Sequence, residues 1–251
     1  MISTIENIFV ILLVLISVKI KGGFKKGTCP VFNRMPRYKN TTASEVSAIE
    51  NYFDWMKAKR EGSKYADCTF KEWCGIDESE LPGKDVIEFY KSFYKKRYSA
   101  WDTEHKYGYS RIMEQVGYWR KANQIHNWFV TNVQDGDDDC DYHHECTKEI
   151  LENLLGVCKT VLDSCTMTYG KVHNGDKGTP NGWEPIYEDG KVVIDASVAD
   201  ELLPCCDGFF FGGCDYDEYY VNDIVDTIKI IENVLAITDF ETQAIYYVSS
   251  W

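Results

Sequence analysis

The chain has 251 residues, and its 40 acidic residues outnumber its 27 lysines and arginines, which gives a formal net charge of −13. This charge argues against general binding of nucleic acid, because neutralising phosphates requires a basic surface. Hydrophobic residues make up 44% of the chain and aromatic residues 14%, which is enough for a packed core and argues against a disordered protein. The length fits one domain of ordinary size with additional segments.

An apolar run near the start of the chain, residues 8–18, is interrupted only by Ser17. No lysine or arginine precedes this run, no small-x-small cleavage motif follows it, and several lysines do follow it. Since positive charge after an apolar run keeps the rest of a chain on the cytosolic side, we expect an uncleaved membrane anchor rather than a cleaved secretory signal or a buried helix. The anchor side chains that we expect to insert into the membrane are Ile8, Phe9, Leu12 and Leu15.

Every charged side chain between Lys19 and Lys39 is positive. We therefore divide the chain into a hydrophobic anchor with its basic flank (residues 1–26), a basic tether (27–43) and a single globular domain (44–251). The tether would lie against anionic lipid headgroups or against an acidic partner.

The globular domain is predicted to begin with a helix over residues 44–60, because Ser44 suits an N-cap and apolar residues then recur at three- and four-residue steps. Residues 81–101 are compatible with a helix or a strand. The same spacing of apolar residues predicts a long helix over residues 110–133 and another helix over residues 147–164.

Residues 169–191 are dense in Gly, Asn, Asp and Pro, which predicts a loop or a hairpin insertion. A short strand is expected at the start of residues 191–204. A last helix is predicted over residues 217–236, and the β-branched and aromatic residues of 244–251 predict a closing strand. The expected fold class is α+β and mainly helical, with about four main helices, a small sheet and an N-terminal hydrophobic helix.

The stretch YWRKANQIHNWFV, which begins at Tyr118, interleaves aromatic, basic, amide and imidazole side chains at helical spacing. Polar residues beside an apolar stripe are compatible with the lining of a ligand cleft. They are also compatible with a helix whose polar groups are satisfied by neighbouring loops, and the residues alone favour this second interpretation. The polar side chains in question are Arg120, Lys121, Asn123, His126 and Asn127.

YWRKANQIHNWFVTNVQDGDDDC resembles a core motif of a family of small uncharacterised proteins of bacteriophages and bacteria. LLPCCDGFFFGGCDYDEYYVNDIVDTI, which begins at Leu202, is similar to the glycine-flanked aromatic segment and following helix of that family, and YYVSSW resembles its end. The resemblance covers residues 114–251, with an insertion at about 169–198, and does not cover the first hundred residues. It implies a fold relationship and a viral context rather than a reaction.

The acidic stretch QDGDDDCDYHHEC, which begins at Gln134, resembles a calcium loop in its alternating aspartates. Cys140 replaces the glycine of that pattern and Cys146 replaces its bidentate glutamate, so an EF-hand is excluded. Zinc binding by these cysteines with His143 and His144 has a spacing that matches no common zinc module. We therefore prefer a solvated acidic turn.

Ten cysteines are many for a cytosolic protein, and their pairing cannot be read from the sequence. Five residues separate Cys68 from Cys74, and five also separate Cys140 from Cys146, so each of these loop pairs could form a disulfide. Three carboxylates near the last helix, Asp215, Asp217 and Glu218, are candidates for acid and base roles. The alternative is that they offset the dipole at the start of that helix.

The leading hypothesis is a non-enzymatic structural protein of a large membrane-containing virus, a minor capsid component that bridges an internal membrane and the capsid shell. Its partners would be other capsid proteins and, through the N-terminal helix, the membrane; nucleic acid, cofactors and metals are not expected. The protein would lie in the virion, associated with an internal or host membrane, and the alternative is secretion or the lumen of the endoplasmic reticulum.

The alternative function is small-molecule or nucleotide binding, for instance by a viral decoy for a host signal. The polar side chains of the Tyr118 stretch would contact the ligand, while Trp119, Trp128 and Phe210 would stack on it. A third hypothesis, a hydrolase that uses His126 or the carboxylates near the last helix, has the weakest support.

Overall fold

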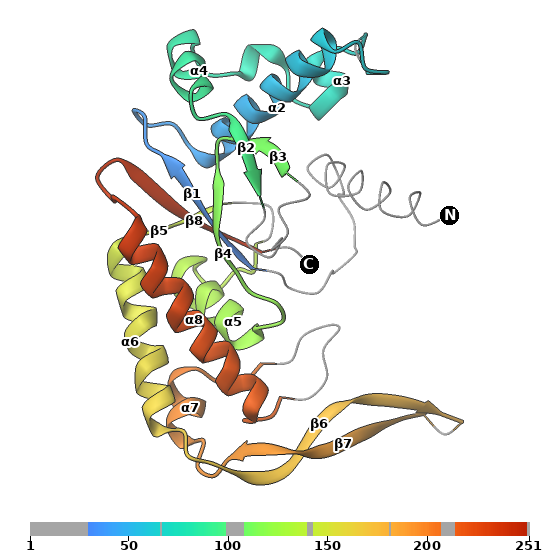
Figure 1. Cartoon of the computed structure of the whole chain (residues 1–251), viewed down its shortest axis with the longest axis vertical. Helices are drawn as coiled ribbons and strands as arrows, with labels where there is room; N and C mark the ends of the chain where they lie inside the picture. The colour runs from blue at the N-terminus through green and yellow to red at the C-terminus, as the bar shows by residue number, and fades with distance from the viewer. Residues whose placement is uncertain are drawn as a thin grey trace. The chain divides into compact units, whose positions relative to one another are not determined.

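The computed structural model of the chain describes residues 30–65, 67–98, 108–139, 143–180, 182–206 and 214–249 (Figure 1). Its contacts divide into two compact units. The first contains Tyr38–Lys96 and Tyr109–Ile112, and the second contains the other described residues. The single domain predicted for residues 44–251 is therefore described below as two units.

The first unit is built on helix α2 (Ala43–Arg60), which confirms the helix predicted over residues 44–60. The indole of Trp55 packs with Phe70 and Cys74 in a small buried cluster. Burying these three side chains stabilises the unit, because helices in water depend on such tertiary packing for most of their stability. The remaining helices of this unit are α3 (Phe70–Cys74), the 3-10 helix η1 (Glu78–Glu80) and α4 (Lys84–Lys91).

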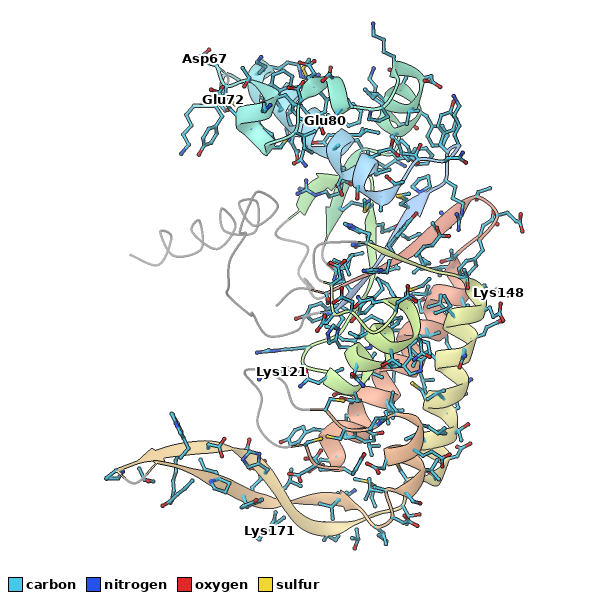
Figure 2. All side chains as sticks on the ribbon, turned by 180° about the vertical axis from the view of Figure 1, so that it is seen from behind. Asp67, Glu72, Glu80, Lys121, Lys148 and Lys171 are labelled. Atoms are coloured by element: carbon cyan, nitrogen blue, oxygen red, sulfur yellow. The ribbon has the colours of Figure 1, made fainter. Side chains whose placement is uncertain are left out.

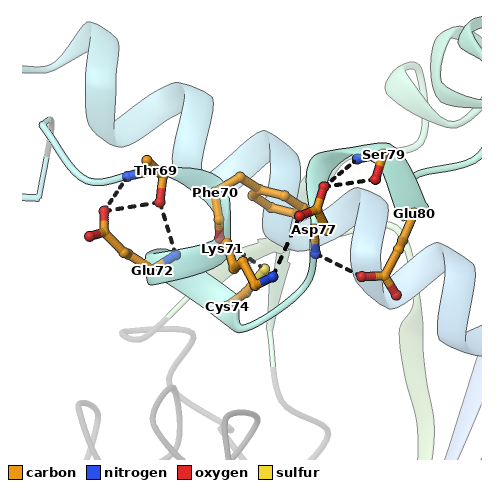
Figure 3. Close-up of polar contacts among 8 residues, drawn as sticks. All are labelled: Thr69, Phe70, Lys71, Glu72, Cys74, Asp77, Ser79 and Glu80. Carbon is orange, nitrogen blue, oxygen red and sulfur yellow. Dashed lines mark hydrogen bonds and ion pairs between the residues drawn. The ribbon is translucent and has the colours of Figure 1, made fainter.

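Side-chain caps begin the helices of the first unit. Thr42, rather than the predicted Ser44, is the N-cap of α2. At the start of α3, the Glu72 amide donates to Thr69 Oγ1 at 3.2 Å and the Thr69 amide donates to the Glu72 carboxylate at 2.8 Å (Figure 3). These hydrogen bonds from Thr69 hold the pKa of Glu72 below its usual value. Asp77 caps η1 in the same reciprocal way (Figure 3).

The ambiguous residues 81–101 contain both kinds of structure. Helix α4 occupies their first part, and strand β2 (Lys95–Tyr98) follows it. β2 pairs with β3 (Gly108–Arg111) in a two-stranded sheet. Both interpretations of this stretch were therefore correct for part of its length.

The second unit contains an antiparallel four-stranded sheet with the strand order β4-β1-β8-β5. Phe32 lies at its centre, opposite Gly117 on one side and Tyr247 on the other. The ring of Phe32 packs edge-on against Trp119 at 4.7 Å and against Phe129 at 5.5 Å. The strands are β1 (Val31–Pro36), β4 (Glu114–Tyr118), β5 (His144–Cys146) and β8 (Gln243–Val248).

β1 lies inside the segment predicted to be a basic tether, and the fold uses its cations internally. Arg34 forms an ion pair with Glu114 at 2.7 Å and donates to the Ile237 carbonyl at 2.6 Å. Arg37 forms an ion pair with Glu145. These two charges are therefore not available to a membrane or an acidic partner in the way that the charge pattern suggested.

Helices α5, α6, α7 and α8 share one buried core with the four-stranded sheet. α6 and α8 pack against each other, and α8 also contacts β4 (Figure 1). The helices predicted over 147–164 and 217–236 are confirmed as α6, with Thr147 as its N-cap, and α8, with Asp217 as its N-cap. The bounds are α5 (Asn123–Val133), α6 (Lys148–Ser164), α7 (Ser197–Leu202) and α8 (Glu218–Ile237).

The helix predicted over residues 110–133 is wrong in its first half. Residues 114–118 form strand β4, and helix α5 begins only at Asn123. The three- and four-residue spacing of Ile112, Val116 and Trp119 was coincidental, because pairing with β1 outweighs local periodicity. Lys121 adopts a positive φ of 67°, which ends the strand and lets the chain turn into the helix.

The expected fold class is also wrong in its proportions. The described residues contain seven α-helices, one 3-10 helix and eight strands, instead of about four helices and a small sheet. Part of the difference is a long hairpin, β6 (Met167–Thr179) and β7 (Gly182–Val193), at the predicted insertion. We call this hairpin the arm. It leads away from α6 and α7 in Figure 1.

The expected hydrophobic helix and its side chains Ile8, Phe9, Leu12 and Leu15 lie outside the described residues. Among the helices that the structure describes, none has the length and apolar character needed to cross a membrane.

Candidate functional site

The structure buries the predicted ligand residues Trp119, His126 and Trp128 in the core. Trp119 is buried, and its indole Nε1 donates to Thr227 Oγ1 at 2.8 Å. His126 is also buried, between the Tyr247 hydroxyl at 2.6 Å and the Asp138 carboxylate at 3.1 Å. Both side chains are thus used inside the protein, as the alternative interpretation of this stretch held.

The other predicted ligand residues have different positions. Arg120, Lys121 and Asn123 line a cavity of about 410 Å³ in the second unit. Asn127 is half-buried and is not part of the lining of this cavity. Phe210 lies outside the described residues.

The cavity brings together four segments that are distant in the sequence. One wall is the connection between β4 and α5, where Lys121 is labelled in Figure 2. Another part of the lining is the start of α8. A hydrogen bond from Trp119, just before the β4–α5 connection, to Thr227 joins this region to α8. The lining residues are Arg120, Lys121, Asn123, Gln124, His173, Asn174, Gly175, Cys205, Cys206, Asp215, Asp217, Tyr219, Tyr220, Asn222 and Asp223.

Two carboxylates in the lining have raised pKa values. Asp217 caps α8, since its Oδ1 accepts from the amides of Tyr219 and Tyr220 at 2.9 and 3.0 Å, and burial raises its pKa. Burial likewise raises the pKa of Asp223 to about 6, although its Oδ2 accepts from Gln124 Nε2 at 3.1 Å. In both cases the low-polarity surroundings disfavour the ionised form more than the hydrogen bonds favour it.

The predicted catalytic carboxylates are only partly assembled. Asp215 and Asp217 line the cavity, whereas Glu218 and His126 are not in the lining. His126 is instead bonded to Tyr247 and Asp138. The clustering that the hydrolase hypothesis required is therefore not found among the described residues, and sequence reasoning missed Asp223, which no local motif distinguishes from other helical aspartates.

The acidic turn before α6 contributes to the fold. Asp138 contacts His126, and His144 lies 3.9 Å from Asp139. Burial raises the pKa of the Cys146 thiol to about 12, so this sulfur is neither a ready metal ligand nor a nucleophile at neutral pH. Cys140 lies outside the described residues, and the described residues hold no group of three or more potential metal ligands.

Cys68 and Cys74, the candidate loop disulfide, are both thiols. Cys74 is buried against Trp55 and Phe70, and burial raises its pKa. A structural role in the small cluster of the first unit accounts for this cysteine.

The arm exposes large apolar side chains. Tyr169 is 86% exposed, Trp183 78% and Tyr187 57%. Figure 2 shows side chains standing out from both sides of the arm, including the labelled Lys171. The strands are held in register by backbone pairing and by cross-strand ion pairs from Lys171 to Asp189 at 2.6 Å and from Lys177 to Glu184 at 3.3 Å. A shift of register between His173 and Asp176 forms a bulge that contributes to the cavity lining.

Comparison with known proteins found no family model, no curated protein and no solved structure that matches this chain. The resemblance to the bacteriophage family stays a prediction.

Proposed function

We propose that this chain is a non-enzymatic structural protein that assembles with a second copy of itself through the arm. The observation that carries the proposal is the exposure of Tyr169 and Trp183, at 86% and 78%, on a two-stranded hairpin. An isolated two-stranded hairpin is marginally stable in water. An arm of this length with exposed aromatic residues is therefore best explained as part of an interface.

The aromatic residues of the arm share one face. Side chains alternate between the two faces of a strand, so Trp183, Tyr187 and Lys191 of β7 point to the same side. The bulge lies in β6 and leaves this alternation intact in β7. Tyr169 pairs with Lys191 and joins the same face. We call this surface, with Tyr169, Trp183 and Tyr187, the aromatic face of the arm.

Charge favours a second copy as the partner. The chain carries a net charge of −13, so two copies repel each other over most of their surface. The aromatic face is an exception, because alternation and register place two lysines and two aspartates on it and its formal charge is zero. Two copies can therefore meet face to face there without net repulsion. The charged residues of this face are Lys171, Lys191, Asp176 and Asp189.

The available area is consistent with a symmetric dimer. Each large aromatic side chain buries about 150–250 Å². The three exposed rings of the aromatic face thus supply on the order of half of the roughly 800 Å² per partner found in a stable interface. The flanking strand surface of the same face can supply part of the remainder.

Sedimentation velocity of the purified full chain over a range of concentrations tests the proposal. We expect a reversible dimer for the natural sequence and a monomer for the double variant Tyr169→Ser, Trp183→Ser. Tyr65→Ser is the matched control, because Tyr65 is 48% exposed in the first unit and lies outside the arm. Circular dichroism establishes that all the variants retain their secondary structure.

A natural sequence that stays monomeric at every concentration, or a double variant that dimerises as well as the control, would overturn the proposal. The narrower hypothesis of a minor capsid component held to an internal membrane depends on residues 1–26. This membrane location and the assembly through the arm are independent proposals.

A further inference from the structure

We propose that the arm modifies itself at Asn174 by spontaneous deamidation. The backbone nitrogen of Gly175 attacks the side-chain amide of Asn174, and the asparagine becomes aspartate or isoaspartate without an enzyme or a cofactor. This modification does not depend on assembly through the aromatic face of the arm, and it takes place in a monomer as well as in a dimer.

The reaction has two steps, and water is its only co-reactant. The Gly175 nitrogen loses its proton and bonds to Cγ of Asn174, and the side-chain nitrogen leaves as ammonia, so that a cyclic succinimide forms. Because both groups belong to one chain, this step needs no encounter between molecules. Water then opens the ring at either of its two carbonyl carbons. One opening gives aspartate, and the other gives isoaspartate, whose backbone is longer by one methylene group.

The first argument is the residue that follows the asparagine. A side chain on this residue hinders the approach of its backbone nitrogen to the asparagine Cγ, and glycine has no side chain. Gly175 adopts a positive φ of 88°, and no described atom lies within 4 Å of the position that a Cβ atom would occupy there. The backbone at Gly175 is therefore uncrowded on the side where other residues carry a side chain.

The second argument is the position of this pair in the hairpin. His173 pairs with Tyr187 and Asp176 pairs with Pro185, so Asn174 and Gly175 form the bulge and have no paired residue in the register of the hairpin. A bulge locally disrupts the ladder that fixes the extended backbone of a strand. The bulge thus loosens β6 at the one place in this strand where an asparagine precedes a glycine. It lies a few residues beyond Lys171, which is labelled in Figure 2.

The third argument is that the amide of Asn174 is available. Asn174 is exposed, and its side chain forms no hydrogen bond with a described residue. Its neighbours His173 and Asp176 are bonded to each other instead, with 3.1 Å between His173 Nε2 and Asp176 Oδ1. No hydrogen bond to a described residue therefore holds the Asn174 amide away from the Gly175 nitrogen.

Exposure alone does not make such a site, and α6 provides the comparison. Asn153 is also exposed, but the residue that follows it is Leu154, which is fully buried. Helical hydrogen bonds fix the backbone on both sides of Asn153. We therefore expect Asn153 to stay unmodified while Asn174 is converted.

Conversion changes the charge of the arm permanently. The neutral amide of Asn174 becomes a carboxylate in a cavity lining that already contains Asp215, Asp217 and Asp223. Each converted chain also adds one negative charge to the net charge of −13. The charge at the bulge therefore changes with the age of the molecule.

Peptide mapping of the purified full chain by mass spectrometry tests the proposal. The folded chain is incubated at neutral and at mildly alkaline pH and is then digested with trypsin, and a sample digested before incubation gives the background. Residues 172–177 and residues 149–159 are released as separate peptides, each with one asparagine. We expect the first peptide to acquire the mass of the carboxyl product, faster at alkaline pH, with isoaspartate in excess of aspartate. The second peptide should stay unchanged.

Two controls accompany the mapping. A synthetic peptide with the sequence of residues 172–177 gives the rate in the absence of the hairpin, because it has the same residues and no bulge. Asn174→Gln is the matched variant of the full chain. Its longer side chain has to close a larger ring, so no conversion should be detected in the time that the natural chain needs.

Three results would overturn the proposal. If the folded chain keeps Asn174 unchanged after the synthetic peptide has been fully converted, the fold protects the pair and the site is rejected. Formation of aspartate alone also rejects it, because direct hydrolysis of the side-chain amide gives no isoaspartate. Conversion of Asn153 at the same rate would show that the glycine and the bulge have no special role.

Discussion

The hydroxyl of Tyr247 and Nδ1 of His126 lie 2.6 Å apart, although 121 residues separate them in the chain. Nε2 of the same imidazole lies 3.1 Å from the Asp138 carboxylate. In the tautomer that carries the proton on Nε2, the ring donates to Asp138 and accepts at Nδ1 from the Tyr247 hydroxyl. His126 therefore ties α5 to β8 and to the acidic turn.

Tyr247→Phe should destabilise the second unit by about 1–3 kcal/mol, because it leaves a buried imidazole nitrogen without its donor. Urea denaturation followed by circular dichroism measures the change. The control is Tyr169→Phe, which removes a hydroxyl from a side chain that is 86% exposed and should change stability by less than about 0.5 kcal/mol. Equal effects of the two substitutions would show that the hydrogen bond contributes nothing.

A second prediction concerns Gly117 in strand β4. A Cβ atom at this position would lie 2.7 Å from Ile230 Cγ2 and 3.3 Å from the Phe32 side chain, so β4 approaches α8 too closely for alanine. Gly117→Ala should cost about 1–3 kcal/mol through overpacking. Thermal unfolding followed by circular dichroism measures this.

The matched control for Gly117 is Gly156→Ala in α6. Nothing lies within 4 Å of a Cβ atom at position 156, and the residue is inside a helix. This substitution should stabilise the protein by about 0.5–1 kcal/mol, because alanine favours a helix over glycine. A stabilising Gly117→Ala would contradict the close packing of β4 on α8.

The sequence predicted those elements that local periodicity determines. α2, α6 and α8 carry regular apolar spacing and suitable N-caps, and all three helices were found. β1 and β4 were missed because their structure depends on pairing with strands far along the chain. The apolar stripe that would reveal a strand is weak in β1, where only Phe32 and Met35 are fully buried.

The sequence predicted only part of the candidate site, because the segments that line it are far apart in the chain. Arg120, Lys121 and Asn123 attracted attention by their density in one stretch, and all three line the cavity. Asp223, which also lines the cavity, is about a hundred residues away in the sequence, and nothing local distinguishes it. Asp217 was noted as a carboxylate at a helix start, and that capping position was the one signal that the sequence carried for it.

The raised pKa of Asp223 has a consequence for stability. Its folded value of about 6 exceeds the ordinary value of 3.8, so the native state binds more protons than the unfolded state between these limits. The contribution of Asp223 to stability is present below about pH 4 and is lost as the pH rises through about 6. Asp223→Asn should therefore raise stability at pH 7, by at most about 3 kcal/mol, and flatten the dependence between pH 4 and 6.

Urea titrations at several pH values measure this dependence. Glu232→Gln is the control, because Glu232 lies on the same helix, but its side chain is 51% exposed and pairs with Lys159 at 2.7 Å. It should leave the profile between pH 4 and 6 almost unchanged. A destabilising Asp223→Asn at pH 7 would mean that the ionised carboxylate is favourable in its place.

The last prediction concerns the membrane hypothesis, and the structure narrows the set of cations involved. The positive charge expected to support membrane binding extended from Lys19 to Lys39, but Arg34 and Arg37 pair with carboxylates inside the second unit and Lys39 pairs with Asp85. Membrane attraction should then depend on the cations that precede Cys29. These cations are Lys19, Lys21, Lys25 and Lys26.

Flotation of the full chain with liposomes tests whether these four lysines attract the membrane. Deleting residues 1–26 should release the protein from neutral and anionic vesicles, because it removes the apolar run. Replacing the four lysines with serine should weaken binding to anionic vesicles only, by about 1 kcal/mol per charge. Arg37→Gln is the control and should leave flotation unchanged, since this cation pairs with Glu145. Undiminished binding after the deletion would contradict an anchoring role for the N-terminus.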